Sequence, residues 1–186
     1  MTVKEYSSIV IEELNRTLSA IKEKETLILA ERIMKAKRIF VAGLGRSGYM
    51  MKALAMRLMH LGLQSYVVGE SVTPNIERGD LLLIGSGSGE TKSILLMAEK
   101  AKTVGATIAL VTIRLQSSIG RISDLTVTIP APTPKANGAS TPKSIQPMAS
   151  LFEQSLLLFL DLLILIIMEK KKIDADTMFE HHANLE

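Results

Sequence analysis

Three hydroxyl side chains lie close together in the stretch IGSGSGET, from Ile84 to Thr91. Each hydroxyl can donate a hydrogen bond, and the glycines between them let backbone N–H groups approach a ligand. An apolar run precedes the stretch and a helical pattern follows it, so the positive end of a helix dipole points at the same place. Because the stretch has no lysine, it favours a phosphate carried on a small molecule over a phosphate that is transferred. The predicted phosphate contacts are Ser86, Ser88, Gly89 and Thr91.

A second glycine-rich turn, GLGRSG, runs from Gly43 to Gly48 after another apolar run. Arg46 offers a planar fork to phosphate or sugar hydroxyls, although a structural salt bridge is its alternative role. Ser47 would contact the ligand, cap the following helix, or do both. The predicted ligand contacts here are Gly45, Arg46 and Ser47.

GLGRSG also fits a dinucleotide-binding fingerprint, whose acidic partner would have to be Glu70. The later turn, SGSGET, repeats the same architecture with hydroxyls in place of room for a pyrophosphate. The dinucleotide site is therefore the weaker hypothesis, and a sugar phosphate is the preferred ligand.

Alternating strands and helices must position these two turns. Five short apolar runs predict strands over residues 38–43, 63–68, 80–85, 106–112 and 125–129. Helical patterns occupy residues 3–18, 25–34, 49–61, 91–103 and, briefly, 117–123. Continuous apolar strands that alternate with helices of about a dozen residues indicate a parallel sheet covered on both faces. The predicted fold class is doubly wound α/β.

A polar segment and a long apolar helix follow the last strand. Residues 130–147 contain five prolines and predict an ordered loop or a mobile lid at the carboxyl edge of the sheet. Residues 148–168 predict a helix that is apolar, and therefore buried, on nearly all sides, which favours a subunit interface. Asp161 leaves its uninterrupted apolar run short of the ~20 residues of a membrane span, so we expect no membrane. A last helix is expected from Ala175 to about His182.

The composition limits the classes of function. The chain has 186 residues, of which 47% are hydrophobic, and a mean hydropathy of +0.25, which favours a homo-oligomer. A net charge of +3 that is not collected into one block argues against nucleic acid. The lack of cysteine fits a reducing cytoplasm, and the N-terminus has no apolar export signal. No metal and no other cofactor is expected, because no cluster of His, Cys or carboxylate residues has metal-ligand spacing.

The two turns, their spacing and the segment IQPMASLFEQ at the start of the long helix resemble the sugar isomerase (SIS) family of phosphosugar-binding domains. The resemblance covers essentially the whole chain. It implies a three-layer α/β sandwich with a five-stranded parallel sheet of flavodoxin-like order, and a homotetramer. The expected single domain, residues 1–186, divides into N-terminal helices (1–36), a sheet core (37–130), a loop (131–147) and C-terminal helices (148–186).

Within the family, GESVTP at Gly69 to Pro74 and the ending MFEHHANLE most resemble the branch that interconverts 3-hexulose 6-phosphate and fructose 6-phosphate. That branch serves formaldehyde fixation in the ribulose monophosphate pathway. Moving a carbonyl from C3 to C2 passes through an enediol, and one carboxylate can carry the proton without a metal. Thr73 is a candidate sugar contact, or simply a turn residue before Pro74.

Glu153 is the carboxylate that we expect to carry the proton, mainly because the family implies a glutamate here. Its alternative role is an acidic first-turn residue that favours the helix dipole. In the family a histidine can assist opening of a cyclic sugar, sometimes across a subunit boundary, which implicates His181 and His182. His182 fits the family's ending better, whereas His181 replaces an expected arginine; both can instead lie on a surface helix. His60 is expected to be a satisfied core or groove histidine.

Two further functions stay open. A non-catalytic phosphosugar sensor would need an output domain, for which the chain has no room before Arg38 beyond the two helices already assigned. A different SIS isomerase would act on arabinose 5-phosphate or sedoheptulose 7-phosphate. The first of these usually carries CBS domains, which are not found here, and the second is harder to exclude.

Overall fold

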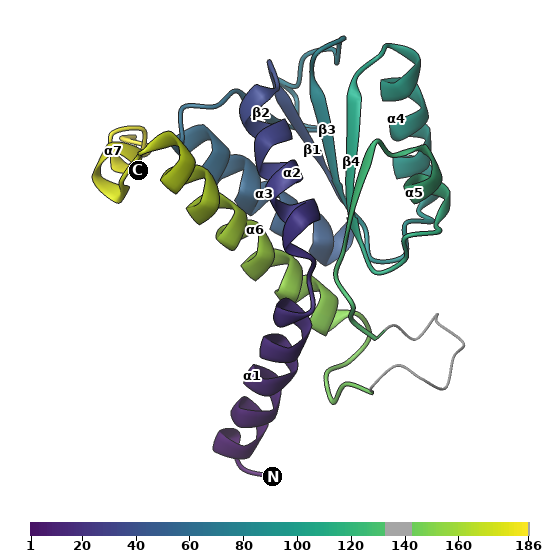
Figure 1. Cartoon of the computed structure of the whole chain (residues 1–186), viewed down its shortest axis with the longest axis vertical. Helices are drawn as coiled ribbons and strands as arrows, with labels where there is room; N and C mark the ends of the chain where they lie inside the picture. Colours follow the sequence, from purple (N-terminus) through teal and green to yellow (C-terminus); the bar gives the residue numbers. More distant parts are fainter. Residues whose placement is uncertain (133–142, 186) are drawn as a thin grey trace.

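A five-stranded parallel sheet lies at the centre of the structure, a computed structural model that describes residues 1–132 and 143–185 (Figure 1). The order of the strands is β2-β1-β3-β4-β5, and every neighbouring pair is parallel. This order confirms the predicted flavodoxin-like sheet. The strands are β1 (Ile39–Ala42), β2 (Ser65–Val67), β3 (Leu81–Gly85), β4 (Thr107–Thr112) and β5 (Leu125–Thr128).

Helices cover both faces of the sheet, as predicted. Side chains of a strand alternate between the two faces, so Ile39 and Val41 enter one apolar cluster while Phe40 enters the other. The larger cluster includes residues of α2 (Glu23–Lys35), α3 (Gly45–His60) and α6 (Ser150–Lys171), and the smaller one includes residues of α4 (Lys92–Thr103) and α5 (Ser118–Ile122). Burial on both faces explains why the strands read as continuous apolar runs.

The first helix, α1 (Val3–Ser19), points away from the sandwich at its N-terminal end (Figure 1). A capping box between Thr2 and Glu5 starts it. The amphipathic pattern predicts Glu13 on the polar side, but Glu13 is only 5% exposed whereas Ile11 is 65% exposed. The prediction is wrong at Glu13 because residues 144–146 pack over its carboxylate.

Several helix boundaries differ from the predicted ones. α3 begins at Gly45 instead of Tyr49, because its first turn is made of small and polar residues that show no apolar periodicity. α6 begins and ends two or three residues later than predicted, and Lys172, in the left-handed conformation, follows it. The last helix, α7 (Ala175–Phe179), stops before the histidine pair. The proline-rich loop is only partly described, because residues 133–142 lie outside the described ranges.

By length and composition alone, α6 is long and apolar enough to cross a membrane, as a buried core helix also can be. Half of its apolar window is buried inside the chain, however, and it packs against α1, α2 and α3 as a core helix does. Its burial is also less complete than predicted. Leu162 and Leu165 are 46% and 58% exposed, so α6 keeps an open apolar side within one chain.

Candidate functional site

Both glycine-rich turns lie at the carboxyl edge of the sheet, after β1 and β3, which are neighbouring strands. From β1 the chain crosses to β2 at one edge of the sheet, and from β3 it continues to β4 on the other side. The carboxyl ends of strands at such a switch point are where open α/β sheets bind ligands. The position expected for the phosphate site is therefore the one that this topology favours.

A cavity of about 410 Å³ opens at this switch point. Hydroxyl groups from both turns line part of it, and apolar side chains from α4, α6 and the end of β4 line the rest. Its lining consists of Leu44, Ser47, Gly85, Ser86, Gly87, Ser88, Thr91, Ile94, Ile113, Met148, Ala149 and Phe152.

Three helices begin at the cavity: α3, α4 and α6. Their N-cap residues, Leu44, Thr91 and Ala149, all line it, and among the described residues no N-cap side chain accepts a hydrogen bond from the first turn of these helices. Of the helices that begin elsewhere, α1, α5 and α7 each have a side-chain cap and α2 does not. Uncapped first-turn N–H groups are ready donors for an anion. The cavity thus collects the positive ends of three helices.

The hydroxyls of the second turn are oriented by the loop itself. Ser86 Oγ accepts a hydrogen bond from Gly89 N at 3.2 Å, and Ser88 Oγ accepts one from Glu90 N at 3.2 Å. Each serine oxygen is thereby fixed while its O–H stays able to donate. The loop requires glycine at position 89, because the backbone there has a φ of +61° and a Cβ would clash with Ser117. The structure therefore gathers Ser47, Ser86, Ser88 and Thr91 around one cavity, whereas Gly45, Arg46 and Gly89 are not among its lining residues.

The first turn packs against the second through glycine. A Cβ on Gly48 would lie 2.7 Å from Gly43 O, and a Cβ on Gly43 would lie 3.1 Å from Gly85 O. Gly45, at φ +58°, takes the left-handed conformation that starts α3. Any larger residue at Gly48 would push the start of α3 away from β1 and from the cavity.

Glu153 and Arg46 form an ion pair beside the cavity. Glu153 Oε2 lies 2.5 Å from Arg46 Nε, which joins the first turns of α6 and α3. The Glu153 side chain is 14% exposed and the Arg46 side chain is 61% exposed. The mostly buried carboxylate is therefore paired with a guanidinium that lies between it and the solvent. Each residue directly adjoins a lining residue in the chain, Phe152 and Ser47 respectively. The salt bridge expected as the alternative role of Arg46 is present.

The structure does not bring Thr73 to the cavity. Its Oγ1 donates to Val67 O at 2.5 Å and its N–H donates to Glu70 O, so the side chain stabilises the turn after β2. Glu70 is paired with Lys52 at 2.6 Å, in an exposed ion pair. A sugar contact of Thr73 stays a prediction.

The histidine pair lies at the other end of α6. The ring of His182 stacks on His60, with the ring centroids 5.4 Å apart, and on Phe179. Burial lowers the pKa of His60, and the charge of Arg57 and the nearby His182 and His181 lower it further. His60 is thus the buried groove histidine that was predicted.

Distance separates these histidines from Glu153 within one chain. Glu153 is in the first turn of α6, and the residues after its last turn carry His182. A helix rises about 1.5 Å per residue, so the rest of α6 beyond Glu153 spans roughly 27 Å. A single chain therefore does not assemble Glu153 with His181 and His182.

The apolar walls of the cavity were not predicted. Ile94 and Phe152 are almost fully buried, and before folding nothing distinguishes them from ordinary core residues. Met148, with φ +56°, gave no sequence signal either. Within the described part of the chain, no group of three His, Cys, Asp or Glu residues is arranged to hold a metal ion.

Comparison with known proteins places the chain in a family. A family model described as SIS domain matches residues 32–158. A 3-hexulose-6-phosphate isomerase of Bacillus subtilis (strain 168) is 50% identical over 186 residues, covering 100% of both chains. A protein of the same name from Mycobacterium gastri is 38% identical over 96% of this chain and 89% of its own. The chain belongs to the SIS-domain family, which confirms the resemblance noted in its sequence.

A solved structure gives the same result. The crystal structure of a hypothetical protein from Methanococcus jannaschii, for which a molecular function of 3-hexulose-6-phosphate isomerase was inferred, superposes with a TM-score of 0.84. The two are 37% identical, and the match covers 98% of this chain and 99% of that one.

Proposed function

We propose that this protein is an isomerase that interconverts 3-hexulose 6-phosphate and fructose 6-phosphate. The observation that carries the proposal is the convergence of three uncapped helix N-termini and four hydroxyl side chains on one cavity, with the carboxylate of Glu153 beside it. The relatives named 3-hexulose-6-phosphate isomerase, at 38% and 50% identity over nearly the whole chain, support the choice of substrate.

The phosphate end of the sugar binds at the helix N-termini. Each N-terminus is equivalent to roughly +0.5 elementary charge, so three of them offset most of the charge of a phosphate dianion. The hydroxyls of Ser86, Ser88 and Thr91 donate the directional hydrogen bonds. Ser47, in the first turn of α3, contacts the same group from the other side of the switch point.

The proton transfer is assigned to Glu153. Its carboxylate takes the proton from C2 while O3 gains a proton, which gives an enediol; the protonated side chain then gives a proton to C3 while O2 loses one and the carbonyl forms at C2, so that one proton passes from O2 to O3 overall. Arg46 holds the carboxylate before substrate arrives. Because Arg46 is largely exposed, its guanidinium can turn to a sugar or phosphate oxygen and leave the carboxylate free to act.

The function is tested by supplying the substrate enzymatically. The protein is incubated with formaldehyde, ribulose 5-phosphate and an active hexulose-phosphate synthase, and fructose 6-phosphate is measured against a reaction without the protein. Formation of fructose 6-phosphate supports the proposal. With active synthase and no product, turnover of sedoheptulose 7-phosphate or arabinose 5-phosphate would identify another isomerase, and binding without any turnover would identify a sensor.

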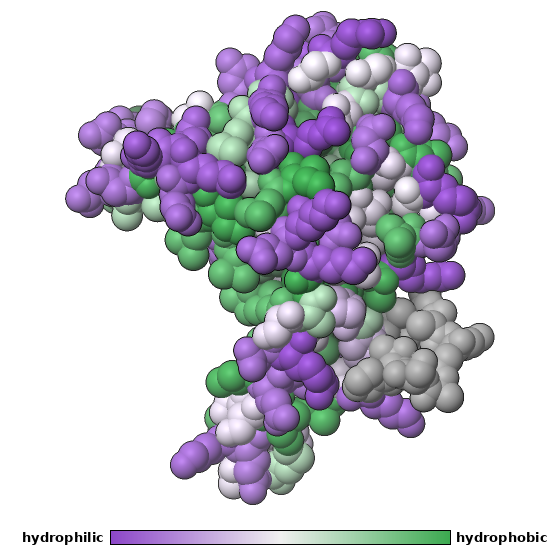
Figure 2. Space-filling view, in the orientation of Figure 1, coloured by the Kyte–Doolittle hydropathy of each residue, from purple (hydrophilic) through white to green (hydrophobic). Residues whose placement is uncertain are grey.

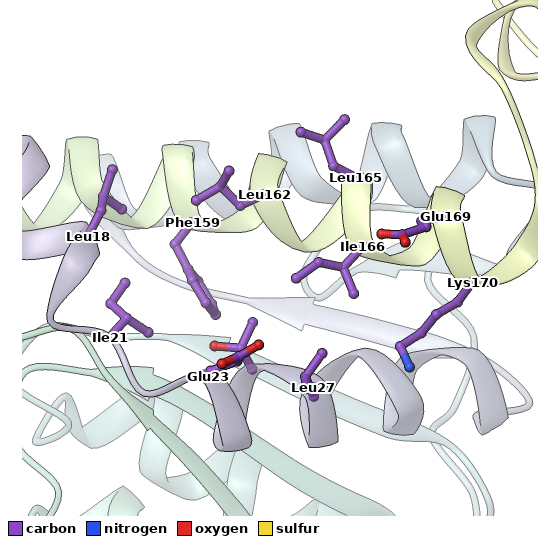
Figure 3. Close-up of a pocket in the computed structure, with 11 residues that line it drawn as sticks. Leu18, Ile21, Glu23, Leu27, Phe159, Leu162, Leu165, Ile166, Glu169 and Lys170 are labelled. Carbon is purple, nitrogen blue, oxygen red and sulfur yellow. The ribbon is translucent and has the colours of Figure 1, made fainter.

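We further propose that the protein works as a homo-oligomer, a tetramer by family resemblance, and that a second copy covers the open side of α6. Apolar residues gather on this face of the molecule (Figure 2). They form a groove of about 670 Å³ between α6 and the α1–α2 region (Figure 3). Phe159 and Ile166 point from α6 into this groove, and Leu162 and Leu165 continue its apolar lining on the exposed side of α6.

An oligomer would also bring a histidine to Glu153 from another subunit. We assign His182, with His181 beside it, to opening the cyclic sugar in the site of a neighbouring subunit. Within a single chain these histidines lie at the opposite end of α6 from Glu153 and cannot serve the same site. Light scattering after size exclusion should show a tetramer for the natural chain and smaller species for Leu165→Glu. Mixing and refolding Glu153→Gln with His182→Gln should restore activity, and failure to restore any would contradict a shared site.

We also propose, as the composition favours, that the chain is a single domain over residues 1–186 and acts in the cytoplasm.

A further inference from the structure

A buried carboxylate lies outside the site just described. Glu13, on α1, is 5% exposed, although charged side chains are seldom buried unless they are paired. Its partners are neutral groups from the other end of the chain. Glu13 Oε2 accepts from Ser144 Oγ at 2.7 Å and from Gln146 Nε2 at 3.0 Å, and Glu13 Oε1 accepts from Ile145 N at 2.9 Å. We call these four residues the Glu13 clamp.

The clamp is internally braced. Gln146 N donates to Ser144 Oγ at 2.9 Å, so the three residues of the segment are folded around the carboxylate and not merely near it. Burial raises the pKa of Glu13, but the hydrogen bonds from Gln146, Ser144 and Ile145 and the charge of Arg16 together lower it by more, so the net pKa lies below its usual value. The carboxylate is therefore charged at neutral pH, and charge-assisted hydrogen bonds are the strong ones.

The clamped segment leads directly into the candidate active site. Only Pro147 separates Gln146 from Met148 and Ala149, which line the phosphate cavity. Met148 has a φ of +56°, a conformation that a non-glycine residue keeps only when its surroundings hold it. Ala149 is the N-cap of α6, and its carbonyl accepts from Glu153 N at 3.0 Å.

The other side of the clamp is equally fixed. α1 packs against α6, and Leu14, next to Glu13 in the chain, and Leu18, just over one turn further on, pack against the main apolar cluster. Glu13 thus connects a helix anchored on the body of α6 to the segment that starts α6. An apolar residue at position 13 would pack in α1 but would give the three donors of the segment no acceptor.

We propose that Glu13 is a positioning residue, which fixes residues 144–149 so that Met148 and Ala149 form the cavity wall and Glu153 faces Arg46 and the substrate. It acts through the segment and does not touch the substrate. The proposal rests on the isomerase function for its kinetic test, and on the cavity alone for its binding test.

The experiment compares Glu13→Gln with Glu12→Gln, its exposed neighbour on α1. Glutamine keeps the shape but offers one acceptor oxygen where the carboxylate offers two. The amide of Ile145 donates to the Glu13 carboxylate, and hydrogen bonds to a charged group stabilise more than neutral ones do. Amide hydrogen exchange at Ile145 should therefore accelerate at least about 10-fold in Glu13→Gln. We expect kcat to fall by about 10-fold with a smaller change in KM, and Glu12→Gln to match the natural protein in both.

A second variant keeps the test independent of the folding of α1. Gln146→Ala removes one donor in a partly exposed segment and should lower kcat in the same direction. In the double variant Glu13→Gln with Gln146→Ala the two losses should not add, because both break one clamp. Fully additive losses would overturn the proposal.

The remaining outcomes separate positioning from a purely structural role. A lower melting temperature with natural kcat per folded molecule would show that Glu13 only stabilises α1, and would overturn the proposal. If the natural protein does not isomerise hexulose phosphate, the proposed function fails, and the clamp is judged by calorimetric binding of fructose 6-phosphate. Weaker binding by Glu13→Gln than by Glu12→Gln supports it, and equal binding overturns it.

Discussion

Replacing Glu153 by glutamine separates proton transfer from everything else the site does. Glutamine has nearly the same shape, and its amide oxygen can still accept from Arg46, whose Nε lies 2.5 Å from the carboxylate. The substitution removes the carboxylate oxygen to which we assign the proton transfer. General acid–base catalysis by one side chain contributes about 10²- to 10⁴-fold, so kcat should fall by that factor. This loss corresponds to about 3–5 kcal/mol in the activation free energy.

The cost in stability should be far smaller. Arg46 is 61% exposed, so water screens the ion pair, and exposed pairs contribute about 0–1 kcal/mol. For a chain of this length, 1 kcal/mol shifts the melting temperature by about 2–4 °C. The proposed phosphate contacts come from other residues, so the affinity for fructose 6-phosphate should stay within a few fold. Glu99→Gln, an exposed carboxylate on α4, is the matched control.

Three measurements decide the matter. A coupled assay gives kcat and KM, calorimetry gives the affinity for fructose 6-phosphate, and mass spectrometry follows deuterium from heavy water into the sugar. We expect Glu153→Gln to bind fructose 6-phosphate and to exchange no deuterium above background. Natural kcat in this variant would refute the role of Glu153. Lost binding with a normal melting temperature would make it a binding residue instead of a base.

Three further predictions follow from the geometry. Ser88→Ala should raise KM by about 10- to 100-fold with little change in kcat, because hydrogen bonds to a charged group contribute about 1.5–3 kcal/mol. The control Ser93→Ala, on the exposed side of α4, should leave KM unchanged. Gly48→Ala should lower the melting temperature by several degrees and weaken phosphate binding, because its Cβ would lie 2.7 Å from Gly43 O. The pKa of His60 is lowered by burial below its unfolded value of about 6.5, so the free energy of unfolding should fall as the pH drops from about 6.5 toward the folded pKa, and less so in His60→Gln.

Each of these has a clear contrary result. An unchanged KM in Ser88→Ala would remove that hydroxyl from the phosphate site. A natural melting temperature in Gly48→Ala would mean that α3 shifts without cost. For His60, chemical denaturation between pH 7.5 and 5.5 gives the sign directly: stability that rises as the pH falls would require a pKa raised by folding, and would contradict burial as the dominant cause.

Much of the fold follows from patterns that are local in the chain. Continuous apolar runs at residues 80–85 and 106–112 are buried strands because both faces of a parallel sheet are covered. A strand, a turn of glycine and hydroxyls, and a helix start occur in sequence at Ser86 to Thr91, so an anion site there could be predicted without knowing the rest. Glu153 was identified mainly through family resemblance, and its place where a polar loop gives way to an apolar helix was a weaker signal.

Helix boundaries and surface placement were predicted less well, for a physical reason. Apolar periodicity reports only the part of a helix that packs on a core, so the polar first turn of α3, with Arg46 and Ser47, was predicted as loop. The same periodicity placed Glu13 among polar positions. It could not show that a segment more than 130 residues later in the chain would supply three donors to its carboxylate.

The sequence by itself determined the sheet and the two glycine-rich turns, because each depends on residue types within a few positions of one another, and family resemblance supplied the candidate base. Only the tertiary structure decided how they meet. It joined Arg46 to Glu153 across 107 residues, brought a third uncapped helix to the cavity, and placed His182 at the opposite end of α6. These facts depend on which helices become neighbours in the fold. Burial of apolar surface decides this, and because it has no preferred direction, the neighbours are fixed only when the whole core assembles.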